Sequence, residues 1–295
     1  MSRRHQKASR PANPLVRVDA RVVALRALFR SVGVLAPATA ARWGESIFCR
    51  PPFHETRPGE LEFLQTGHAF RVPHEELDVA AWTWGERGPL VLLMHGWGSR
   101  ASRFRFFVPP FVAAGFRVVA LDGPGHGQTG GTRASLPQFA AALTAVAHAT
   151  GEVAGVVGHS LGGAAAIFAM GRGLRPVPMV AIAAPAEPAA FFQRFARHLR
   201  LPSRVRERIR ESLEARLGVK WSDLDVPAIA ARNASPLLVI HDAGDHDVPI
   251  GDGRAIAIAA GGTLLETQGL GHRAIMRDPE VVHATVTFLA RHLTS

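Results

Sequence analysis

A short apolar run that passes through a glycine-bounded turn into an alanine-rich segment constrains this chain more than any other feature. Residues 153–157 (VAGVV) have the composition of a buried strand, and residues 161–170 have that of a helix. The turn between them reads G-H-S-L-G, with Gly158 and Gly162 on either side of Ser160. A Cβ at either glycine would clash in so tight a turn, which lifts the serine hydroxyl clear of the backbone. The sequence therefore predicts a nucleophile elbow.

Apolar runs of the fully buried kind alternate with helical patterns on both sides of this turn. The predicted strands are 70–72, 77–84, 89–94, 116–121, 153–157, 177–183, 236–240 and 263–267, and the predicted helices are 106–114, 136–149, 161–170, 254–260 and 280–292. This alternation predicts an α/β protein with a mostly parallel central sheet of about eight strands, flanked by helices. The first two strands are predicted to form an antiparallel pair.

Three divisions of the chain follow from where the alternation begins and breaks. Residues 69–186 and 236–295 would form the α/β core, and residues 187–235, helical and rich in arginine, would form a small helical cap inserted into it. Residues 1–68 would form a basic N-terminal extension.

Within that extension, residues 1–14 are predicted to be disordered, because they are basic and contain proline. Apolar residues spaced by three and four from Leu15 to Val32 predict an amphipathic helix. We favour packing of this helix against the protein body, with peripheral contact at a membrane surface as the alternative. No element is predicted for residues 36–68.

The formal net charge of +10 is concentrated in two segments. Residues 1–30 have a charge of +7, residues 194–220 have +6, and the rest of the chain is slightly acidic. Such segments suit phosphate, anionic lipid or an acidic protein, or are solvated helix faces. They lack interleaved aromatic residues and match no nucleic-acid-binding motif, so no nucleic-acid partner is predicted.

The composition also bears on location. No apolar stretch is long enough to span a bilayer, and arginines interrupt any signal-peptide core near the N-terminus. The single cysteine, Cys49, excludes an internal disulfide and suits a reducing compartment. We therefore expect a cytoplasmic protein, with peripheral membrane association left open.

A serine hydroxyl is a weak nucleophile unless a base removes its proton and an acid orients that base. Two loops downstream of Ser160 offer such partners. The predicted strand 236–240 runs into a loop that contains Asp242, Asp245 and Asp247, and the strand 263–267 is followed by a glycine-rich loop that contains His272. The chain thus carries serine, acid and histidine in that order.

Residues 69–295 resemble the α/β-hydrolase fold family in this order of motifs. The family pattern H-x-x-x-D-x-x-V-P fits the segment from His241 to Pro249 and selects Asp245 as the acid over Asp242 and Asp247. The family's G-H pair before the last helix fits His272 and the glycine before it. The resemblance implies a catalytic triad of Ser160, His272 and Asp245, without a cofactor or a metal.

Acyl transfer also needs two N–H groups that stabilise the negative charge on the carbonyl oxygen. The resemblance implies that Leu161, the residue after the nucleophile, supplies one of them. The loop after the third predicted strand reads M-H-G-W-G-S, and in relatives that carry H-G-x the residue after the glycine supplies the other. That residue is Trp97, which follows Gly96.

Two other site chemistries are less well supported. Gly125, Gly127 and Gly130 spell G-x-G-x-x-G, but the next helix begins only near Leu136 and the next strand lacks the acidic residue that binds ribose. We interpret this segment as a structural turn. The histidines and aspartates of residues 241–247 alternate along one segment and point in different directions, which disfavours a metal site.

The predicted function is therefore a serine hydrolase that cleaves carboxylic esters of small molecules through an acyl-enzyme. A thioesterase, or an ester hydrolase that acts on an acidic acyl carrier protein, is the first alternative, because pimeloyl-carrier-protein methyl esterases share the H-G-W-G loop. A non-catalytic binding protein of the same fold is the second. Three phenylalanines of the predicted cap would line an acyl pocket or hold the cap to the core: Phe191, Phe192 and Phe195.

Overall fold

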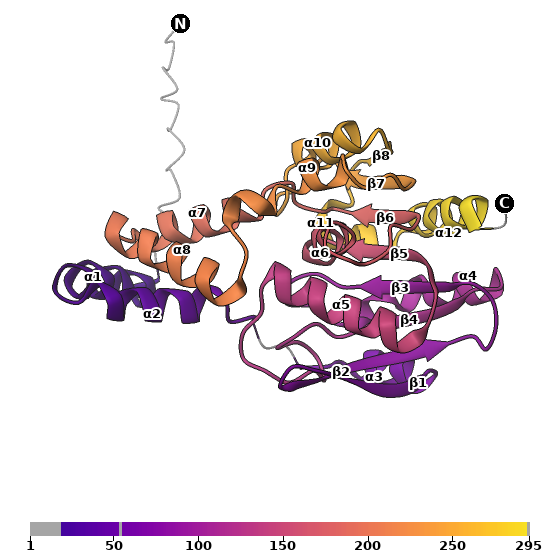
Figure 1. Cartoon of the computed structure of the whole chain (residues 1–295), viewed down its shortest axis with the longest axis horizontal. Helices are drawn as coiled ribbons and strands as arrows, with labels where there is room; N and C mark the ends of the chain where they lie inside the picture. The colour runs from indigo at the N-terminus through magenta and orange to yellow at the C-terminus, as the bar shows by residue number, and fades with distance from the viewer. Residues whose placement is uncertain (1–18, 53–54, 294–295) are drawn as a thin grey trace, which may run out of the picture.

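An eight-stranded sheet forms the centre of the computed structural model, which describes residues 19–52 and 55–293 (Figure 1). The strands are β1 (His68–His74), β2 (Leu77–Trp84), β3 (Leu90–Met94), β4 (Arg117–Leu121), β5 (Val153–His159), β6 (Met179–Ile182), β7 (Leu237–Asp242) and β8 (Thr263–Thr267). Their order is β1-β2-β4-β3-β5-β6-β7-β8. The antiparallel pairs are β1 with β2 and β2 with β4, and all other neighbours are parallel. The predicted sheet is confirmed.

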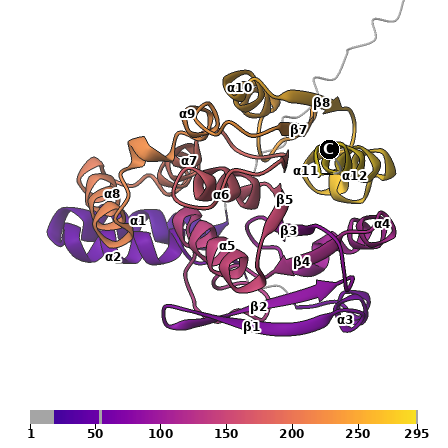
Figure 2. The same ribbon diagram turned by 45° about the vertical axis from the view of Figure 1, so that its right-hand side comes forward.

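Helices cover both faces of this sheet, as Figure 2 shows. One face packs against α5 (Leu136–Thr150), α6 (Leu161–Met170), α9 (Val226–Ala230) and α10 (Ile250–Ala260). The other packs against α3 (Pro58–Gln65), the 3-10 turn η1 (Ala101–Phe106), α4 (Val108–Ala113) and α12 (Pro279–Leu293). Because both faces are covered, every residue of β3 and β7 is buried, as the unbroken apolar runs of parallel strands require.

The strand order determines which loops meet. The strands β3 and β5 lie side by side at the centre of the sheet, and β6, β7 and β8 follow β5 in parallel register. Carboxyl ends of parallel strands lie at one edge of a sheet, where α/β proteins bind their ligands. The loops after β3, β5, β7 and β8 therefore converge there.

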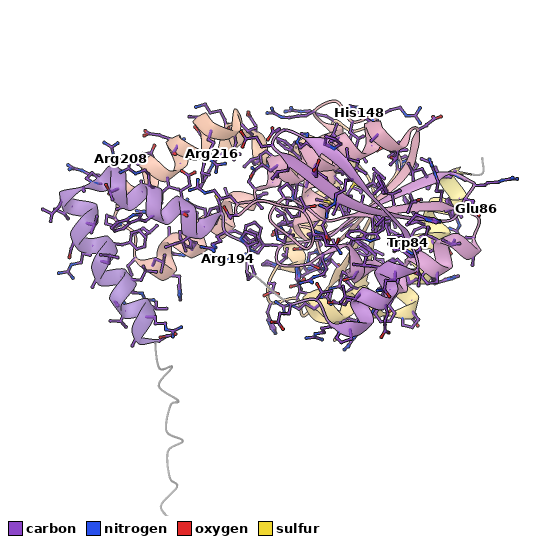
Figure 3. The ribbon with its side chains drawn as sticks, turned by 90° about the horizontal axis from the view of Figure 1, so that it is seen from below. Trp84, Glu86, His148, Arg194, Arg208 and Arg216 are labelled. Carbon is purple, nitrogen blue, oxygen red and sulfur yellow. The ribbon has the colours of Figure 1, made fainter. Side chains whose placement is uncertain are left out.

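Four helices form a second body that projects from the sheet (Figures 1 and 3). We call it the helical module: α1 (Ala20–Leu35), α2 (Pro37–Phe48), α7 (Pro188–Leu199) and α8 (Ser203–Leu217). Its apolar core is separate from the two cores of the sheet and includes Phe29, Ala40, Phe192, Val205 and Ile209. The predicted cap therefore does not stand alone: two helices from the N-terminal segment share its core.

The N-terminal segment departs from the prediction. Residues 36–68, for which no element is predicted, contain α2 and α3. The buried side of α2 carries Ala40, Ala41, Gly44 and Glu45, and a Cβ on Gly44 would lie 2.6 Å from Cδ1 of Ile209. Such a face lacks the stripe of large apolar side chains from which helices are predicted. Residues 1–18, including the predicted disordered segment and the first turn of the predicted helix, lie outside the described residues.

Three shorter elements complete the described chain. The 3-10 turn η2 (Trp221–Leu224) lies between α8 and α9, and α11 (Gly271–Ala274) and the 3-10 turn η3 (Ile275–Arg277) follow β8. No helix among the described residues is both long and apolar enough to cross a bilayer.

Candidate active site

The turn between β5 and α6 has the strained geometry that its sequence predicts. Ser160 has φ of 52° and ψ of −123°, a backbone conformation that costs free energy for any residue with a Cβ. The glycines are required by close packing: a Cβ on Gly158 would lie 2.5 Å from Cα of Gly163, and one on Gly162 would lie 2.2 Å from the Met94 carbonyl oxygen. The Ser160 N–H donates to the carbonyl of Ile182 at 2.8 Å. The elbow is thus clamped between β3 and β6.

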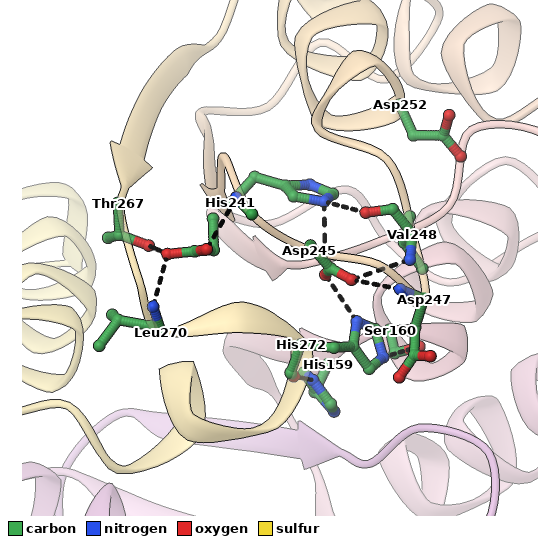
Figure 4. A network of polar contacts seen from close by, with 12 residues as sticks. His159, Ser160, His241, Asp245, Asp247, Val248, Asp252, Thr267, Leu270 and His272 are labelled. Carbon is green, nitrogen blue, oxygen red and sulfur yellow. Dashed lines mark hydrogen bonds and ion pairs between the residues drawn. The ribbon is translucent and has the colours of Figure 1, made fainter. Parts of the chain in front are cut away.

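The structure brings Ser160, His272 and Asp245 together from the segments that follow β5, β8 and β7 (Figure 4). Nε2 of His272 lies 3.0 Å from Oγ of Ser160, and Nδ1 of His272 lies 2.7 Å from Oδ2 of Asp245. Because a carboxylate only accepts, Nδ1 of His272 carries a proton, which leaves Nε2 free to accept the serine proton when the ring is neutral. This arrangement can transfer a proton from serine to histidine.

The Asp245 carboxylate is buried and well supplied with donors. Its Oδ1 accepts the N–H groups of Asp247 at 2.8 Å and Val248 at 2.9 Å. Burial opposes the charged form, but the hydrogen bonds from His272 and from these backbone groups outweigh it and hold the pKa of Asp245 below its usual range. The side chain is therefore a carboxylate at neutral pH.

The other two aspartates of this loop have different surroundings. Asp242 is buried, and its Oδ2 accepts from Thr267 Oγ1 at 2.9 Å and from the Leu270 N–H at 3.0 Å, while its Oδ1 accepts from the Gly244 N–H at 2.9 Å. It thereby joins the end of β7 to the loop that carries His272. Asp247 is exposed and borders the cavity in front of Ser160.

His159, which precedes the nucleophile, supports the segment that carries His272. Burial, and then the nearby His272, lower the pKa of His159 to about 3, so its ring is neutral. Its Nε2 donates to the His272 carbonyl at 2.9 Å. Within the described residues its Nδ1 is buried without a partner, beside the cavity. Sequence reasoning missed this residue and Asp242 as supports, because their contacts span β5, β7 and β8.

Two neutral histidines fix the loop after β3. His95 donates from Nδ1 to the Gly96 carbonyl at 2.7 Å and accepts the Gly123 N–H on Nε2 at 2.9 Å. His126 donates from Nδ1 to the carbonyl of Pro124 at 2.8 Å and accepts the Gly98 N–H on Nε2 at 2.9 Å. Burial lowers the pKa of both rings, that of His126 to about 4, which keeps each in the neutral form that these bonds need.

This loop brings Trp97, one of the two predicted oxyanion donors, to the cavity in front of the nucleophile. A Cβ on Gly96 would lie 2.8 Å from Cβ of Ser160, so only glycine allows the approach. Trp97 is 38% exposed and lines the cavity with Ser160, while Leu161 is the first residue of α6, where N–H groups have no acceptor within the helix. The turn from Gly125 to Gly130 is held by Asp122, whose Oδ2 accepts the Gln128 N–H at 2.7 Å.

The predicted acyl pocket needs correction. Of the three phenylalanines, only Phe191 lines the cavity. Phe192 is buried in the core of the helical module, 5.2 Å from the ring of Phe48, and Phe195 lies 5.3 Å from the same ring. Helical spacing of 191, 192 and 195 places the last two on the face that meets α1 and α2, so they hold the module together.

A cavity of about 1170 Å³ lies in front of Ser160 and His272. Its walls carry six arginines that sequence reasoning did not assign to the site: Arg57, Arg100, Arg103, Arg105, Arg194 and Arg273. A signal existed, because S-R-A-S-R-F-R directly follows the H-G-W-G loop and Arg273 directly follows His272. Within the part of the chain that the structure describes, no three His, Cys, Asp or Glu side chains are placed to hold a metal ion.

Comparison with known proteins gives the family. The model of the family described as serine aminopeptidase, S33, matches residues 85–284. The chain belongs to this family of α/β-hydrolase-fold serine hydrolases. The match includes the elbow, the acid loop and His272.

Individual relatives agree with the fold over shorter or more divergent stretches. The magnesium-chelatase 30 kDa subunit of Rhodobacter capsulatus is 39% identical over 84 residues, 27% of this chain and 29% of that protein. A monoacylglycerol lipase of Mycolicibacterium smegmatis is 36% identical over 90 residues, 28% and 32% of the two chains. The chain spans about a third or less of the length of these curated relatives. The crystal structure of the monoacylglycerol lipase of Paleococcus ferrophilus has a TM-score of 0.58 at 24% identity, covers 72% of this chain and 99% of that one, and shows the shared fold.

Proposed function

We propose that this serine hydrolase cleaves carboxylic esters by a Ser160–His272–Asp245 triad. The observation that carries the proposal is the continuous chain of hydrogen-bond distances, 3.0 Å from Ser160 Oγ to His272 and 2.7 Å from His272 to Asp245. A nucleophile, a base and an orienting acid within such reach are the minimum that acyl transfer needs. Lipase relatives support the ester as substrate.

In the proposed mechanism Ser160 Oγ attacks the carbonyl carbon while His272 Nε2 takes its proton. The buried Asp245 carboxylate stabilises the imidazolium that forms, and the N–H groups of Trp97 and Leu161 donate to the oxyanion. His272 then returns the proton to the leaving alkoxide, which leaves an acyl group on Ser160. Water, activated by His272, releases the acid in the second half of the reaction.

Two other functions are possible for this fold: one uses the same triad, and the other does not use it for catalysis. A thioesterase, or a hydrolase of esters on an acidic acyl carrier protein, would use the same triad, and the basic residues around the cavity support such a partner. A non-catalytic binding protein would need neither the strained elbow, which costs free energy to maintain, nor the alignment of His272 with Ser160.

Labelling with a fluorophosphonate probe tests the proposal. Wild-type protein should label and should cleave p-nitrophenyl esters, and Ser160→Ala should abolish both. Ser99→Ala is the matched control, because Ser99 lines the same cavity outside the proposed triad. Wild-type protein that neither labels nor cleaves a series of esters and thioesters would overturn the enzyme assignment.

We also propose that the helical module contacts anionic lipid. Val34 and Leu35 at the end of α1 are 75% and 85% exposed, and Trp43 and Ile47 of α2 are more than 40% exposed. Arginines lie on the same two helices, a combination suited to an anionic bilayer surface. A Val34→Asp/Leu35→Asp variant should lose binding to phosphatidylglycerol vesicles. Ile258→Asp, at an 81% exposed position on α10 of the α/β region, should bind these vesicles like the wild type. Equal binding by all three proteins would refute the contact.

A further inference from the structure

The walls of the active-site cavity have an excess of positive charge. Against the six arginines stand three carboxylates, Glu55, Glu60 and Asp247. Cavities lined by one sign of charge concentrate the field and attract ligands of the opposite sign. A cavity adapted to neutral acyl chains would instead be mostly apolar.

Three segments bring the arginines of one wall together. Arg103 and Arg105 lie on η1, Arg57 lies just before α3, and Arg273 follows His272 on α11. All four line the cavity with Ser160. The positive charge therefore lies beside the proposed reaction centre.

The other two cavity arginines have partners in the protein. Arg194 donates to the Asp247 carbonyl at 3.2 Å and lies 4.2 Å from the centre of the Phe191 ring, at the junction seen in Figure 3. Arg100 is buried and donates to Thr56 Oγ1. Arg194 and Arg100 thus have structural partners in the cavity walls.

Arg103 differs from them. Within the described residues it has no carboxylate within 4 Å, and its Nε reaches Ser99 Oγ only at 3.5 Å. Burial lowers the pKa of Arg103, and the charges of Arg105, Arg273 and Arg57 lower it further, while only Glu60 opposes them. Glu60 is itself 3.9 Å from Arg105. A half-buried guanidinium among like charges is costly unless an anion is bound to it.

We propose, on the basis of the proposed function, that the ester substrate carries an anionic group, a carboxylate or a phosphate, and that Arg103, Arg105 and Arg273 bind it. Guanidinium groups bind either anion through paired N–H donors. The anion neutralises the wall, and its attachment to the ester positions the carbonyl at Ser160. The arginines thus select the substrate, while the triad performs the chemistry.

A matched pair of esters tests the proposal. Mono-p-nitrophenyl glutarate and p-nitrophenyl valerate have acyl chains of the same length, but the glutarate ends in a carboxylate and the valerate in a methyl group. The glutarate should have a kcat/KM at least about tenfold higher at low salt, and added salt should reduce the difference. Equal kcat/KM values for the two esters would overturn the proposal.

Arginine variants assign the preference to this wall. Arg103→Gln and Arg273→Gln should each lower kcat/KM for the glutarate about tenfold, mainly through KM, and change that for the valerate less than twofold. Arg277→Gln, an exposed arginine of η3 outside the cavity, should change neither. If the ratio of kcat/KM for the glutarate to that for the valerate is unchanged in both cavity variants, the assignment is refuted. The Arg273 substitution should not prevent folding, because this side chain is exposed.

Binding without turnover separates this inference from the proposed function. Inorganic phosphate and glutarate should bind the Ser160→Ala protein in calorimetry, and Arg103→Gln should weaken that binding about tenfold. The stronger of the two ligands identifies the anion. If neither binds, the anion site is excluded even if esters are cleaved; if both bind but no ester is cleaved, the proposed hydrolysis fails and the anion site remains.

Discussion

The α/β core and the helical module achieve order by different means. The core buries whole strands, such as β3 and β7, and joins them through backbone hydrogen bonds. The module packs four helices around an apolar core of its own, and two of its carboxylates are nearly buried. Glu45 of α2 accepts from Ser212 at 2.6 Å and from Arg216 at 3.0 Å, and Glu214 pairs with Lys220 at 2.9 Å.

The difference shows where each region can tolerate change. In the core, closely packed backbone segments position the elbow, so a single carbon atom added at Gly158 or Gly162 would displace Ser160. In the module, side chains provide the contacts, so a substitution weakens packing without moving Ser160. The comparison predicts that activity and module stability can be altered separately.

The largest effect is expected at Gly162. Gly162→Val places carbon atoms where a Cβ alone would lie 2.2 Å from the Met94 carbonyl oxygen, so the turn must open and Ser160 must leave its position. We expect kcat/KM to fall by at least about a thousandfold, because misplacement of about 1 Å alone costs about a hundredfold. Ester hydrolysis and fluorophosphonate labelling measure the loss. Gly251→Ala, where an added Cβ meets no atom within 4 Å, should retain activity, and an active Gly162→Val protein would show that the clamp is not needed.

The next effect tests the module. Ile209→Ala leaves a cavity beside Gly44 in the module core and should destabilise the module by about 2–5 kcal/mol. Hydrogen exchange should become faster in α2 and α8 and remain slow in β5, while turnover of p-nitrophenyl valerate changes less than about threefold. Ile209→Val should have a smaller effect in the same direction. Faster exchange of β5 in the alanine variant would mean that the two regions unfold as one unit.

The same difference explains what the sequence could predict. Unbroken apolar runs such as 89–94 and the G-x-S-x-G turn are local signals, and they predict the sheet and the elbow. The buried face of α2 consists of Ala40, Ala41, Gly44 and Glu45, which lack the stripe of large apolar residues that predicts a helix. A helix pair that depends on close approach between segments far apart in the sequence has no local sequence pattern from which it can be predicted.

The site divides in the same way. The family's spacing of motifs points to Asp245, in the loop after β7, and to His272, on α11 after β8. The supports, His159 and Asp242, act through hydrogen bonds to residues 113 and 28 positions away, and no periodicity predicts such bonds. The arginines that line the cavity were not predicted, because those of one wall come from three segments far apart in the sequence.

The smallest effect concerns Asp242, a positioning residue of the core. Asp242→Asn keeps the shape but replaces one acceptor oxygen with a donor, which loosens the loop between Thr267 and Leu270. We expect kcat to fall about tenfold with KM unchanged, because His272 is less well aligned while the cavity remains.

The pH dependence of stability distinguishes this role from simple packing. Burial opposes ionisation of Asp242, but donors from Leu270, Gly271 and Thr267 outweigh it and lower its pKa below the usual value of 3.8. A carboxyl group with a lowered folded-state pKa stabilises the fold above its unfolded pKa, and this contribution is lost as pH falls through the folded pKa. Wild-type stability should therefore decrease below about pH 4, and Asp242→Asn should flatten that decrease. Denaturant unfolding at pH 3 to 7 measures both curves, and parallel curves would show that the Asp242 charge does not hold the loop.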